Sequence, residues 1–376
     1  MMRVRFFDAV KLSCFGVLLA VPAGTQALTW STNSPLPGSG KRNNSVVSQG
    51  ADIYSLGGRP DDDDGDTYAA DDIYHGVIDN TGAITWVKAP NSLPGKRTEG
   101  GTAIVNGKIY YWGGWTTNFP TLPTCYYAPL AAGIVGPWIT SSVTLPQDGG
   151  EDLGDSFGRN NLAFNNTLYT INGENNSGNL SNLGNYSRLT LAGDYGTWTS
   201  TNEPGDSATW WHGMAVFQGT SANYIYKIGG GPDANAYSSA ENTVQRAEIN
   251  ADGSLGSWIQ LTDTIPAPNG IMDFACIQDG NKIYIVGGSD NTGTAQTSVY
   301  IGEINASNGD IAWSTDADAL PEARVRVSGN LATAPNGTKY LVIPGGAAAT
   351  GVSPGLNTVL TAPLPPPTEV KNWEMY

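Results

Sequence analysis

A pair of glycines that follows a short apolar segment recurs along the chain at a nearly constant interval, and this repeat constrains the fold more than any other feature. The pairs, one of which begins with Asn, are 56 to 59 residues apart: Gly57/Gly58, Gly113/Gly114, Asn172/Gly173, Gly229/Gly230, Gly287/Gly288 and Gly345/Gly346. A fixed period of about this length indicates an array of one supersecondary unit.

The unit is clearest in residues 281–321. An apolar strand ends on Gly287 and Gly288, an alternating strand follows a polar loop, and a turn at Asn308-Gly309 leads to a strand that carries Trp313. Short segments rich in Tyr, Ile and Val and bounded by Gly, Pro, Asn and Asp are typical of β-strands. Asn-Gly turns supply the positive φ that a tight hairpin requires. With the strand that leads into it, each unit predicts a four-stranded meander.

This pattern resembles the kelch repeat of galactose-oxidase-like β-propellers, and the resemblance covers essentially all of residues 28–376. It implies an all-β fold: a six-bladed β-propeller of four-stranded kelch-like blades, in one domain. The chain departs from the kelch pattern at Asn172, which replaces a glycine, and at Glu203, which replaces the Leu before Pro204. Its repeat is also longer than the kelch norm of about 50 residues.

The strand that closes the ring is left open by the sequence. Tryptophans of the fourth-strand type occur seven times, once more than the glycine pairs: Trp30, Trp86, Trp138, Trp198, Trp258, Trp313 and Trp373. Either Trp30 closes the last blade from the N-terminus, or Trp373 does so from the C-terminus.

Residues 1–27 have the composition of a secretory signal peptide. Arg3, Arg5 and Lys11 precede an apolar run over residues 12–21, and small residues lead to Ala27. We therefore expect residues 28–376 to be exported, to an extracellular, cell-surface or periplasmic location. No later stretch approaches the roughly 20 apolar residues of a membrane-spanning helix.

The charge balance and the cysteines exclude several classes of protein. The chain has 34 acidic against 19 basic residues, a net charge of -15, which repels phosphate backbones and anionic lipid. We expect no nucleic-acid partner, no membrane insertion and a monomer. Cys125 and Cys276 fall in separate repeats, too far apart for the Cα separation of about 7 Å that a disulfide allows, so both are predicted to be free thiols.

The repeated Gly and Trp residues are interpreted as structural. The glycines allow close backbone approach or positive φ, and each Trp is expected to pack between neighbouring blades. Function in a propeller is expected where the repeat varies, above all in the residues that lead into each innermost strand. These leads contain Arg42, Asn43, Asn44, Arg97, Thr98, Glu99, Arg159, Asn160, Asn161, Trp210, Trp211, His212, Met272, Asp273, Phe274, Arg324 and Arg326.

Because a propeller brings its leads to the mouth of the central channel, the leads predict a ligand site there. The ligand-binding candidates are Arg97, Arg159, Trp211, His212, Asp273 and Arg326. Glu99 and His212 are the candidates for acid–base chemistry, if the protein is an enzyme. In the alternative interpretation, the arginines pair with acids or carbonyls of adjacent blades.

An acidic loop is the other unusual segment. Its carboxylates are Asp61, Asp62, Asp63, Asp64 and Asp66, and Asp71 and Asp72 follow closely. Carboxylates this dense either stay solvated or bind a hard cation such as calcium. The spacing is not that of an EF-hand, because Pro60 stands where the first ligand would be.

These features predict an exported recognition propeller that holds a carbohydrate or a protein partner at the channel mouth. One alternative is a sugar mutarotase, because the chain is similar in size, export and blade number to the N-acetylneuraminate epimerases. Another is a structural surface protein. A copper radical oxidase of the galactose oxidase type is disfavoured, since His75 and His212 are the only histidines and lie in different repeats.

Overall fold

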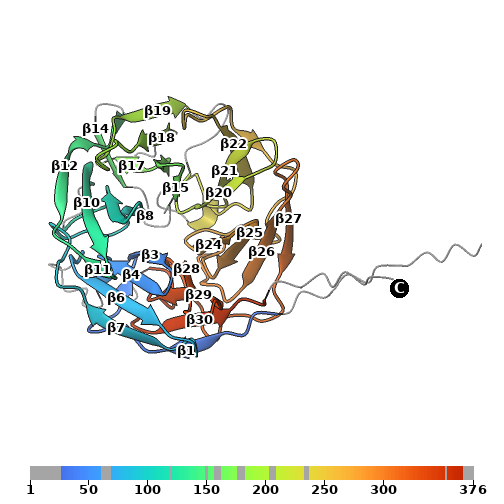
Figure 1. The fold of residues 1–376 in the computed structure, drawn as a ribbon. Helices are drawn as coiled ribbons and strands as arrows, with labels where there is room; N and C mark the ends of the chain where they lie inside the picture. Colours follow the sequence, from blue (N-terminus) through green and yellow to red (C-terminus); the bar gives the residue numbers. More distant parts are fainter. Residues whose placement is uncertain are drawn as a thin grey trace, which may run out of the picture.

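The computed structural model describes residues 27–60, 69–117, 121–148, 151–155, 162–175, 183–202, 209–232, 237–351 and 354–366. Within these residues the chain forms six antiparallel blades around a central axis, with one strand of each blade innermost (Figure 1). The fold is therefore the all-β, six-bladed propeller that the repeat predicts. None of the described segments forms a helix long and apolar enough to cross a membrane.

Each blade is a four-stranded meander whose strands follow one another from the axis outward. Blade 1 consists of β3 (Ser45–Gln49), β4 (Asp52–Leu56), β6 (Ile73–Ile78) and β7 (Ile84–Lys88). Blade 2 consists of β8 (Gly101–Val105), β9 (Lys108–Trp112), β10 (Thr124–Ala131) and β12 (Ile139–Thr144), with the short β11 (Ile134–Val135) also paired to β10. Blade 3 consists of β15 (Leu162–Phe164), β16 (Thr167–Ile171), β18 (Leu183–Arg188) and β19 (Trp198–Asn202).

The second half of the ring repeats this order. Blade 4 consists of β20 (Gly213–Gln218), β21 (Asn223–Ile228), β22 (Val244–Ile249) and β23 (Ile259–Gln260). Blade 5 consists of β24 (Ala275–Asp279), β25 (Lys282–Val286), β26 (Val299–Ile304) and β27 (Ile311–Thr315). Blade 6 consists of β28 (Asn330–Thr333), β29 (Lys339–Pro344), β30 (Val359–Pro363) and β1 (Ser31–Asn33).

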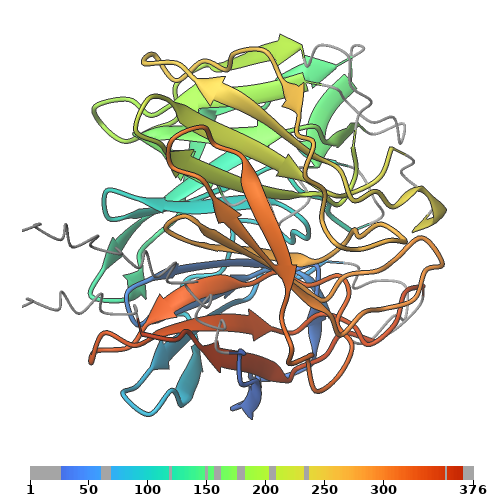
Figure 2. The ribbon, with the colours of Figure 1, turned by 90° about the vertical axis from the view of Figure 1, so that its right-hand side faces the viewer.

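Small elements lie outside the blades. They are the pair β2 (Lys41–Arg42) and β5 (Arg59–Pro60), the sheet of β13 (Gln147–Asp148), β14 (Glu151–Asp155) and β17 (Glu174–Asn175), and the 3-10 turn η1 (Tyr237–Ser239). In an antiparallel meander, the loops between second and third strands leave the ring on the same side as the leads into the innermost strands. Figure 2 shows the ring from the side, with η1 among the longer loops on one side.

The N-terminal segment closes the ring. β1 pairs with β30, with Ser31 opposite Thr361 and Asn33 opposite Val359, and Figure 1 shows the two strands side by side. Trp30, immediately before β1, packs on the cluster between blades 5 and 6. The first of the two closing strands that the sequence allowed is thus the one used, whereas Trp373 lies outside the described residues.

The core of the protein is divided among the six interfaces between successive blades. Each of six hydrophobic clusters draws its residues from two neighbouring blades, so that together they run once around the ring. The fourth-strand tryptophan of each blade packs on the preceding blade; Trp258, for example, joins Tyr169 and Ile171 of blade 3. This confirms the structural interpretation of the repeated Trp.

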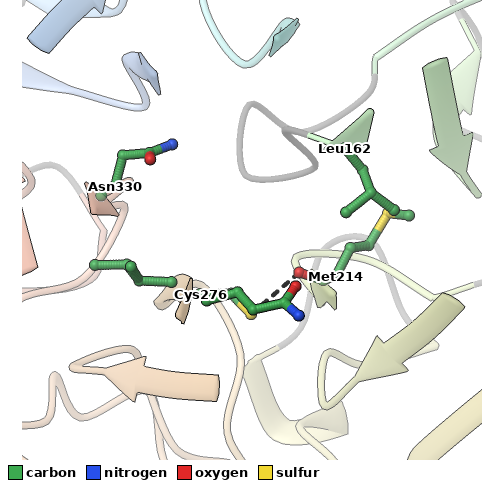
Figure 3. Close-up of a pocket in the computed structure, with 7 residues that line it drawn as sticks. Leu162, Met214, Cys276 and Asn330 are labelled. Atoms are coloured by element: carbon green, nitrogen blue, oxygen red, sulfur yellow. Dashed lines mark hydrogen bonds between the residues drawn. The ribbon is translucent and has the colours of Figure 1, made fainter. Parts of the chain in front are cut away.

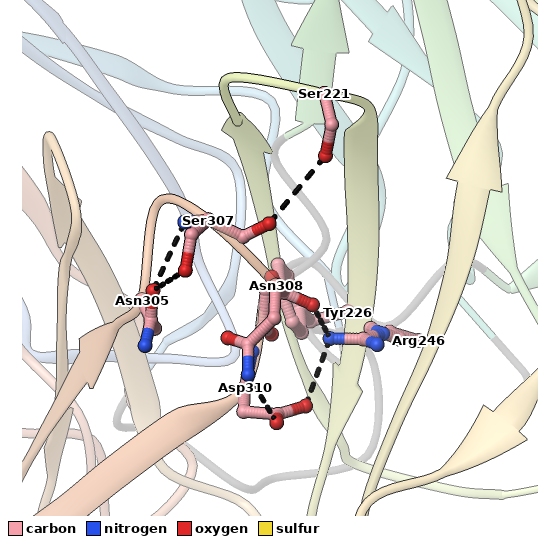
Figure 4. A network of polar contacts seen from close by, with 8 residues as sticks. Ser221, Tyr226, Arg246, Asn305, Ser307, Asn308 and Asp310 are labelled. Carbon is pink, nitrogen blue, oxygen red and sulfur yellow. Dashed lines mark hydrogen bonds and ion pairs between the residues drawn. The ribbon is translucent and has the colours of Figure 1, made fainter.

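In four of the blades, a tyrosine on the second strand forms a hydrogen bond to the next blade. Its hydroxyl donates to a glycine carbonyl in the hairpin between the third and fourth strands, at 2.8 to 3.0 Å: Tyr54 to Gly133, Tyr110 to Gly193, Tyr169 to Gly253 and Tyr226 to Gly309. Figure 4 shows the blade 4–5 example, where Arg246 also donates to the Asn308 carbonyl at 2.6 Å and to Asp310 Oδ1 at 3.1 Å.

The glycine pairs form the backbone contacts between blades. The second glycine donates its N–H to a lead carbonyl of the next blade, as from Gly58 to Arg97 at 2.9 Å and from Gly288 to Arg324 at 2.7 Å. A Cβ on the first glycine would meet the same carbonyl, at 2.3 Å for Gly57 and 2.5 Å for Gly287. Both glycines of each of these pairs also have positive φ. Close approach and positive φ, as predicted, are the reasons for the pair.

Candidate functional site

The mouth of the channel is built on a ring of residues in the left-handed backbone conformation. Asn43, Glu99, Trp211, Asp273 and Arg326 have φ between 52° and 64°, and each stands just before an innermost strand. None is a glycine, so each costs about 1–2 kcal/mol of backbone energy. We call these five residues the mouth ring.

Hydrogen bonds between neighbouring members join the mouth ring. The N–H of Asp273 donates to Trp211 O at 2.9 Å, and that of Arg326 donates to Asp273 O at 3.1 Å. In the same way, the N–H of Asn43 donates to Arg326 O at 2.9 Å, and the N–H of Glu99 donates to Asn43 O at 3.0 Å. These bonds link blades 4, 5, 6, 1 and 2 and compensate the unfavourable φ. Asn160, the residue of blade 3 nearest this position in the sequence, lies outside the described residues.

The residue that follows each member of the mouth ring is buried behind it, against a second glycine. A Cβ on Gly230 would lie 2.8 Å from His212 Cβ, and a Cβ on Gly288 would lie 2.9 Å from Phe274 Cβ. His212 is 0 % exposed. The structure therefore places this candidate for acid–base chemistry in the layer beneath the mouth ring, not in it.

The lead arginines of blades 2 and 6 occupy two different places. Arg97 and Arg324 lie two residues before the ring and are buried. Arg97 Nη2 donates to Thr124 Oγ1 at 2.9 Å and to the Tyr126 hydroxyl at 2.7 Å, while Arg324 Nη2 forms an ion pair with Glu322 at 2.6 Å. These two pair with the protein itself, but with groups of their own blades, whereas the alternative interpretation named acids or carbonyls of adjacent blades. Arg326 is the arginine that belongs to the mouth ring.

An aromatic group forms one wall of the mouth. The rings of Trp210 and Trp211 stack with centroids 4.0 Å apart, and Tyr237 of η1 lies against Trp211 at 5.1 Å. The Tyr237 hydroxyl donates to Asp273 Oδ2 at 3.0 Å. A loop of blade 4 thereby joins the leads of blades 4 and 5.

Charged groups converge beside this wall. Burial alone would lower the pKa of Arg326, but the nearby Tyr237, Asp273 and Glu99 raise it above its ordinary value. Burial, followed by the charge of Asp273, raises the pKa of Tyr237, so its hydroxyl stays protonated and donates. Glu99 Oε1 in turn accepts a hydrogen bond from Asn43 Nδ2. Asp273 is 0 % exposed and Glu99 is largely buried, so these charges interact in a poorly hydrated environment.

The candidates from the sequence are therefore partly assembled. Trp211, Asp273, Arg326 and Glu99 share the mouth, whereas Arg97 and His212 are directed into the protein and Arg159 lies outside the described residues. Sequence reasoning missed Tyr237. It stands in a loop, and no periodic signal marks which loop residue folds back over the mouth.

The structure does not test the metal site that the sequence suggests in the acidic loop. Asp61, Asp62, Asp63, Asp64 and Asp66 lie outside the described residues, so calcium binding there stays a prediction. Asp72 forms ion pairs with Lys88 and with Lys41, the latter at 3.6 Å. In the part of the chain that the structure describes, no three His, Cys, Asp or Glu side chains are close enough to hold a metal ion.

A small cavity lies in the channel among the innermost strands of blades 3 to 6 (Figure 3). Its volume is about 160 Å³, and its lining includes Leu162, Met214, Cys276, Gln278 and Asn330. Gln278 bridges blades 4 and 5 by accepting from Val216 N at 3.0 Å and donating to Val216 O at 2.6 Å. Ligand pockets are typically about 300–1,000 Å³, so this cavity is small for a sugar, and we place the candidate site at the mouth.

Comparison with known proteins supports the fold. No sequence-family profile and no curated protein sequence matches the chain. Among solved structures, that of YjhT is similar, with a TM-score of 0.62 over 87% of this chain and 95% of that chain, at 13% sequence identity. At this identity the likeness extends to the propeller fold alone.

Proposed function

We propose that this protein is a recognition propeller that binds an uncharged saccharide at the mouth ring. The observation that carries the proposal is the meeting of the Trp211–Tyr237 wall with Asp273, Arg326 and Glu99 from four blades. Tyr237 is half-buried and offers an apolar ring face to a sugar, backed by the buried Trp211. The half-buried Arg326 guanidinium donates to hydroxyl groups, while the buried carboxylates of Asp273 and Glu99 hold these two groups in place.

The charges favour a neutral ligand over an anionic one. Asp273 and Glu99 together outweigh Arg326, so the described charged groups of the mouth ring have a net charge of -1, in a chain whose net charge is -15. A ligand carboxylate would compete with Asp273 and Glu99 for Arg326. An uncharged saccharide has no such competition and forms only hydrogen bonds.

A glycan array probed with the purified protein, followed by calorimetric titration of each saccharide that binds, tests this proposal. Tyr237→Ala and Arg326→Gln are expected to weaken binding at least tenfold, and neutral sugars to bind more tightly than sialylated ones. Tyr127→Ala is a matched control, since Tyr127 lies on β10 and contacts Lys108, away from the mouth ring. Absence of binding to any saccharide, or binding that both mouth variants leave unchanged, would refute the proposal. If the protein binds no saccharide but binds another protein, the recognition partner is a protein instead.

A sugar mutarotase is the second candidate, and the paired carboxylates are the observation that favours it. Glu99 and Asp273 both act on Arg326 from different blades, and mutarotation requires an acid and a base on opposite sides of the anomeric carbon. Under this alternative, the saccharide that binds would equilibrate its anomers faster in the presence of the protein. Glu99→Gln would abolish the acceleration and leave binding measurable. Equal rates with and without protein would exclude this candidate.

A further inference from the structure

The N-terminal segment of the propeller makes an unusual contact with blade 5. The backbone nitrogen of Leu28 lies 3.2 Å from Oδ1 and 3.3 Å from Oδ2 of Asp316, in the turn after β27. The Leu28 side chain is 2 % exposed and belongs to the cluster between blades 5 and 6. The first residues before β1 are thus held at both their side chain and their backbone.

The carboxylate of Asp316 is held in place for this contact. Asp316 N–H donates to Val299 O at 2.9 Å, and Asp318 N–H donates to Asp316 Oδ1 at 2.9 Å. Among the described residues, no lysine, arginine or histidine forms an ion pair with Asp316. Its charge therefore faces the Leu28 nitrogen without a side-chain cation beside it.

The chemistry of the two groups is better matched by a free amine than by a peptide. A peptide nitrogen carries one hydrogen, which cannot point well at two oxygens, whereas an ammonium carries three and can donate to both. A hydrogen bond between ionised partners is also about twice as strong as a neutral one. Ala27, directly before Leu28, ends the segment that has the composition of a signal peptide.

We propose that the Ala27–Leu28 peptide bond is a processing site for a signal peptidase, and that Asp316 binds the α-ammonium group that the cut creates. Water adds across the C–N bond, its hydroxyl going to the Ala27 carbonyl carbon and its proton to the Leu28 nitrogen, which takes a second proton from solvent near neutral pH. Because Leu28 is buried in the closed ring, the cut precedes closure. The new terminus then fastens β1 to blade 5, independently of any ligand at the mouth.

N-terminal sequencing and intact mass of the exported protein test the position of the cut. Leu28 is expected as the first residue. A mature chain that begins elsewhere, or that keeps residues 1–27, would overturn the proposal.

A double comparison tests the ion pair. Asp316→Asn is made in the chain that begins at Leu28 and in one that keeps Ala27 as its first residue, and thermal unfolding is followed at pH 6.5. The substitution is expected to lower Tm by about 2–4 °C in the first chain and by less than half as much in the second, where the ammonium is displaced by one residue. Asp318→Asn, which keeps the backbone donor, is the matched control and is expected to leave Tm unchanged in both. Equal losses in the two chains would mean that Asp316 serves only the amide.

The pH dependence gives a second readout. The titratable groups around the pair are Asp316 and Asp318 in the turn, and Tyr284 on β25, which also feels Asp279 and Glu303. Burial raises the pKa of Tyr284 to about 12, so below pH 10 the terminal amine is the group that titrates. An α-amino group has a pKa of about 8 when unfolded, and the pair raises it, so the stabilisation is present below pH 8 and lost as the pH rises through the higher value. The Tm advantage over Asp316→Asn should therefore shrink between pH 7 and 10; a constant difference would contradict the pair.

Discussion

The hydroxyl of Tyr237 donates a 3.0 Å hydrogen bond to Oδ2 of Asp273, and this bond ties a loop of blade 4 to the mouth ring of blade 5. The two residues are on different blades, and Asp273 is fully buried. A loop residue outside the repeat therefore helps to hold a repeat position in the conformation found at the mouth.

Tyr237→Phe should weaken this arrangement without removing the aromatic wall. The loss of one hydrogen bond to a buried carboxylate is expected to cost about 1–3 kcal/mol of unfolding free energy. Saccharide affinity should fall about fivefold or more, equivalent to about 1 kcal/mol. Urea unfolding and calorimetric titration measure the two effects. Tyr127→Phe is the control, and equal stability and affinity in both variants would contradict the assigned role of the hydroxyl.

Tyr226→Phe tests the contact between second strands and neighbouring hairpins. The hydroxyl bonds the Gly309 carbonyl of blade 5 at 2.8 Å, and its removal should lower the unfolding free energy by about 1 kcal/mol. Tyr300→Phe is the matched control, because the described residues include no hydrogen-bond partner for the Tyr300 hydroxyl. Similar chemical denaturation curves for the two variants would show that the inter-blade bond contributes nothing.

Removal of the closing strand should be far more damaging than removal of the C-terminal end. A chain that begins at residue 34 loses β1 and the buried Leu28, and leaves β30 as an unpaired edge that can template aggregation. We expect a loss of at least about 3 kcal/mol, from one buried Leu and the Trp30 contact. A chain that ends at residue 366 should keep its thermal stability. The reverse order of stabilities, measured by calorimetry, would mean that closure depends on the C-terminal residues.

Asp72 should contribute stability that depends on pH. Asp72 forms ion pairs with two lysines. The side chain of Lys41 is 2 % exposed, whereas that of Lys88 is 59 % exposed. Burial alone would raise the pKa of Asp72, but the hydrogen bond from Lys88 and the charge of Lys41 lower it. A depressed carboxyl pKa stabilises the folded state above the unfolded value of about 3.9, and this stabilisation is lost as the pH falls below it.

Asp72→Asn is therefore expected to cost about 3 kcal/mol at pH 7, because it leaves the buried Lys41 charge unbalanced. Lys88→Ala should cost no more than about 0.5 kcal/mol. Urea unfolding at pH 7 and pH 3 checks both, and the difference between wild type and Asp72→Asn should be smaller at pH 3, because Asp72 becomes protonated as the pH falls toward its lowered pKa. A difference of the same size at both pH values would rule out the ion pair as its cause.

Both cysteines should be free and slow to react. Cys125 and Cys276 form no disulfide, as the repeat predicted, and burial raises the pKa of each thiol to about 12. At pH 8 the reactive thiolate is then only about one part in 10⁴. A thiol reagent should label the native protein slowly, with Cys276 in the channel cavity before Cys125, and should count two thiols in urea. A count of three would show that Cys14 and the leader remain.

The sequence predicted the architecture because every unit repeats the same local rules. The Gly pairs, the fourth-strand Trp and the Asn-Gly or Asp-Gly turns each act on neighbours within about 60 residues, so their spacing gave the number of blades, the order of the strands and the role of the repeated residues. The separation of the two cysteines followed from the same count. Site residues were only partly predictable, since the leads were recognised as a group but not by position.

Only the tertiary structure decided which residues of different blades contact one another, because the repeat does not mark these residues. A shift of two positions along a lead separates Arg326 in the mouth ring from Arg324 buried on Glu322, and a shift of one buries His212. Closure by β1, the fold-back of Tyr237 and the approach of Leu28 to Asp316 join residues far apart in the chain. Such contacts depend on the ring being closed, because only then do the blades bring these side chains within hydrogen-bonding distance; no local pattern of residues encodes them.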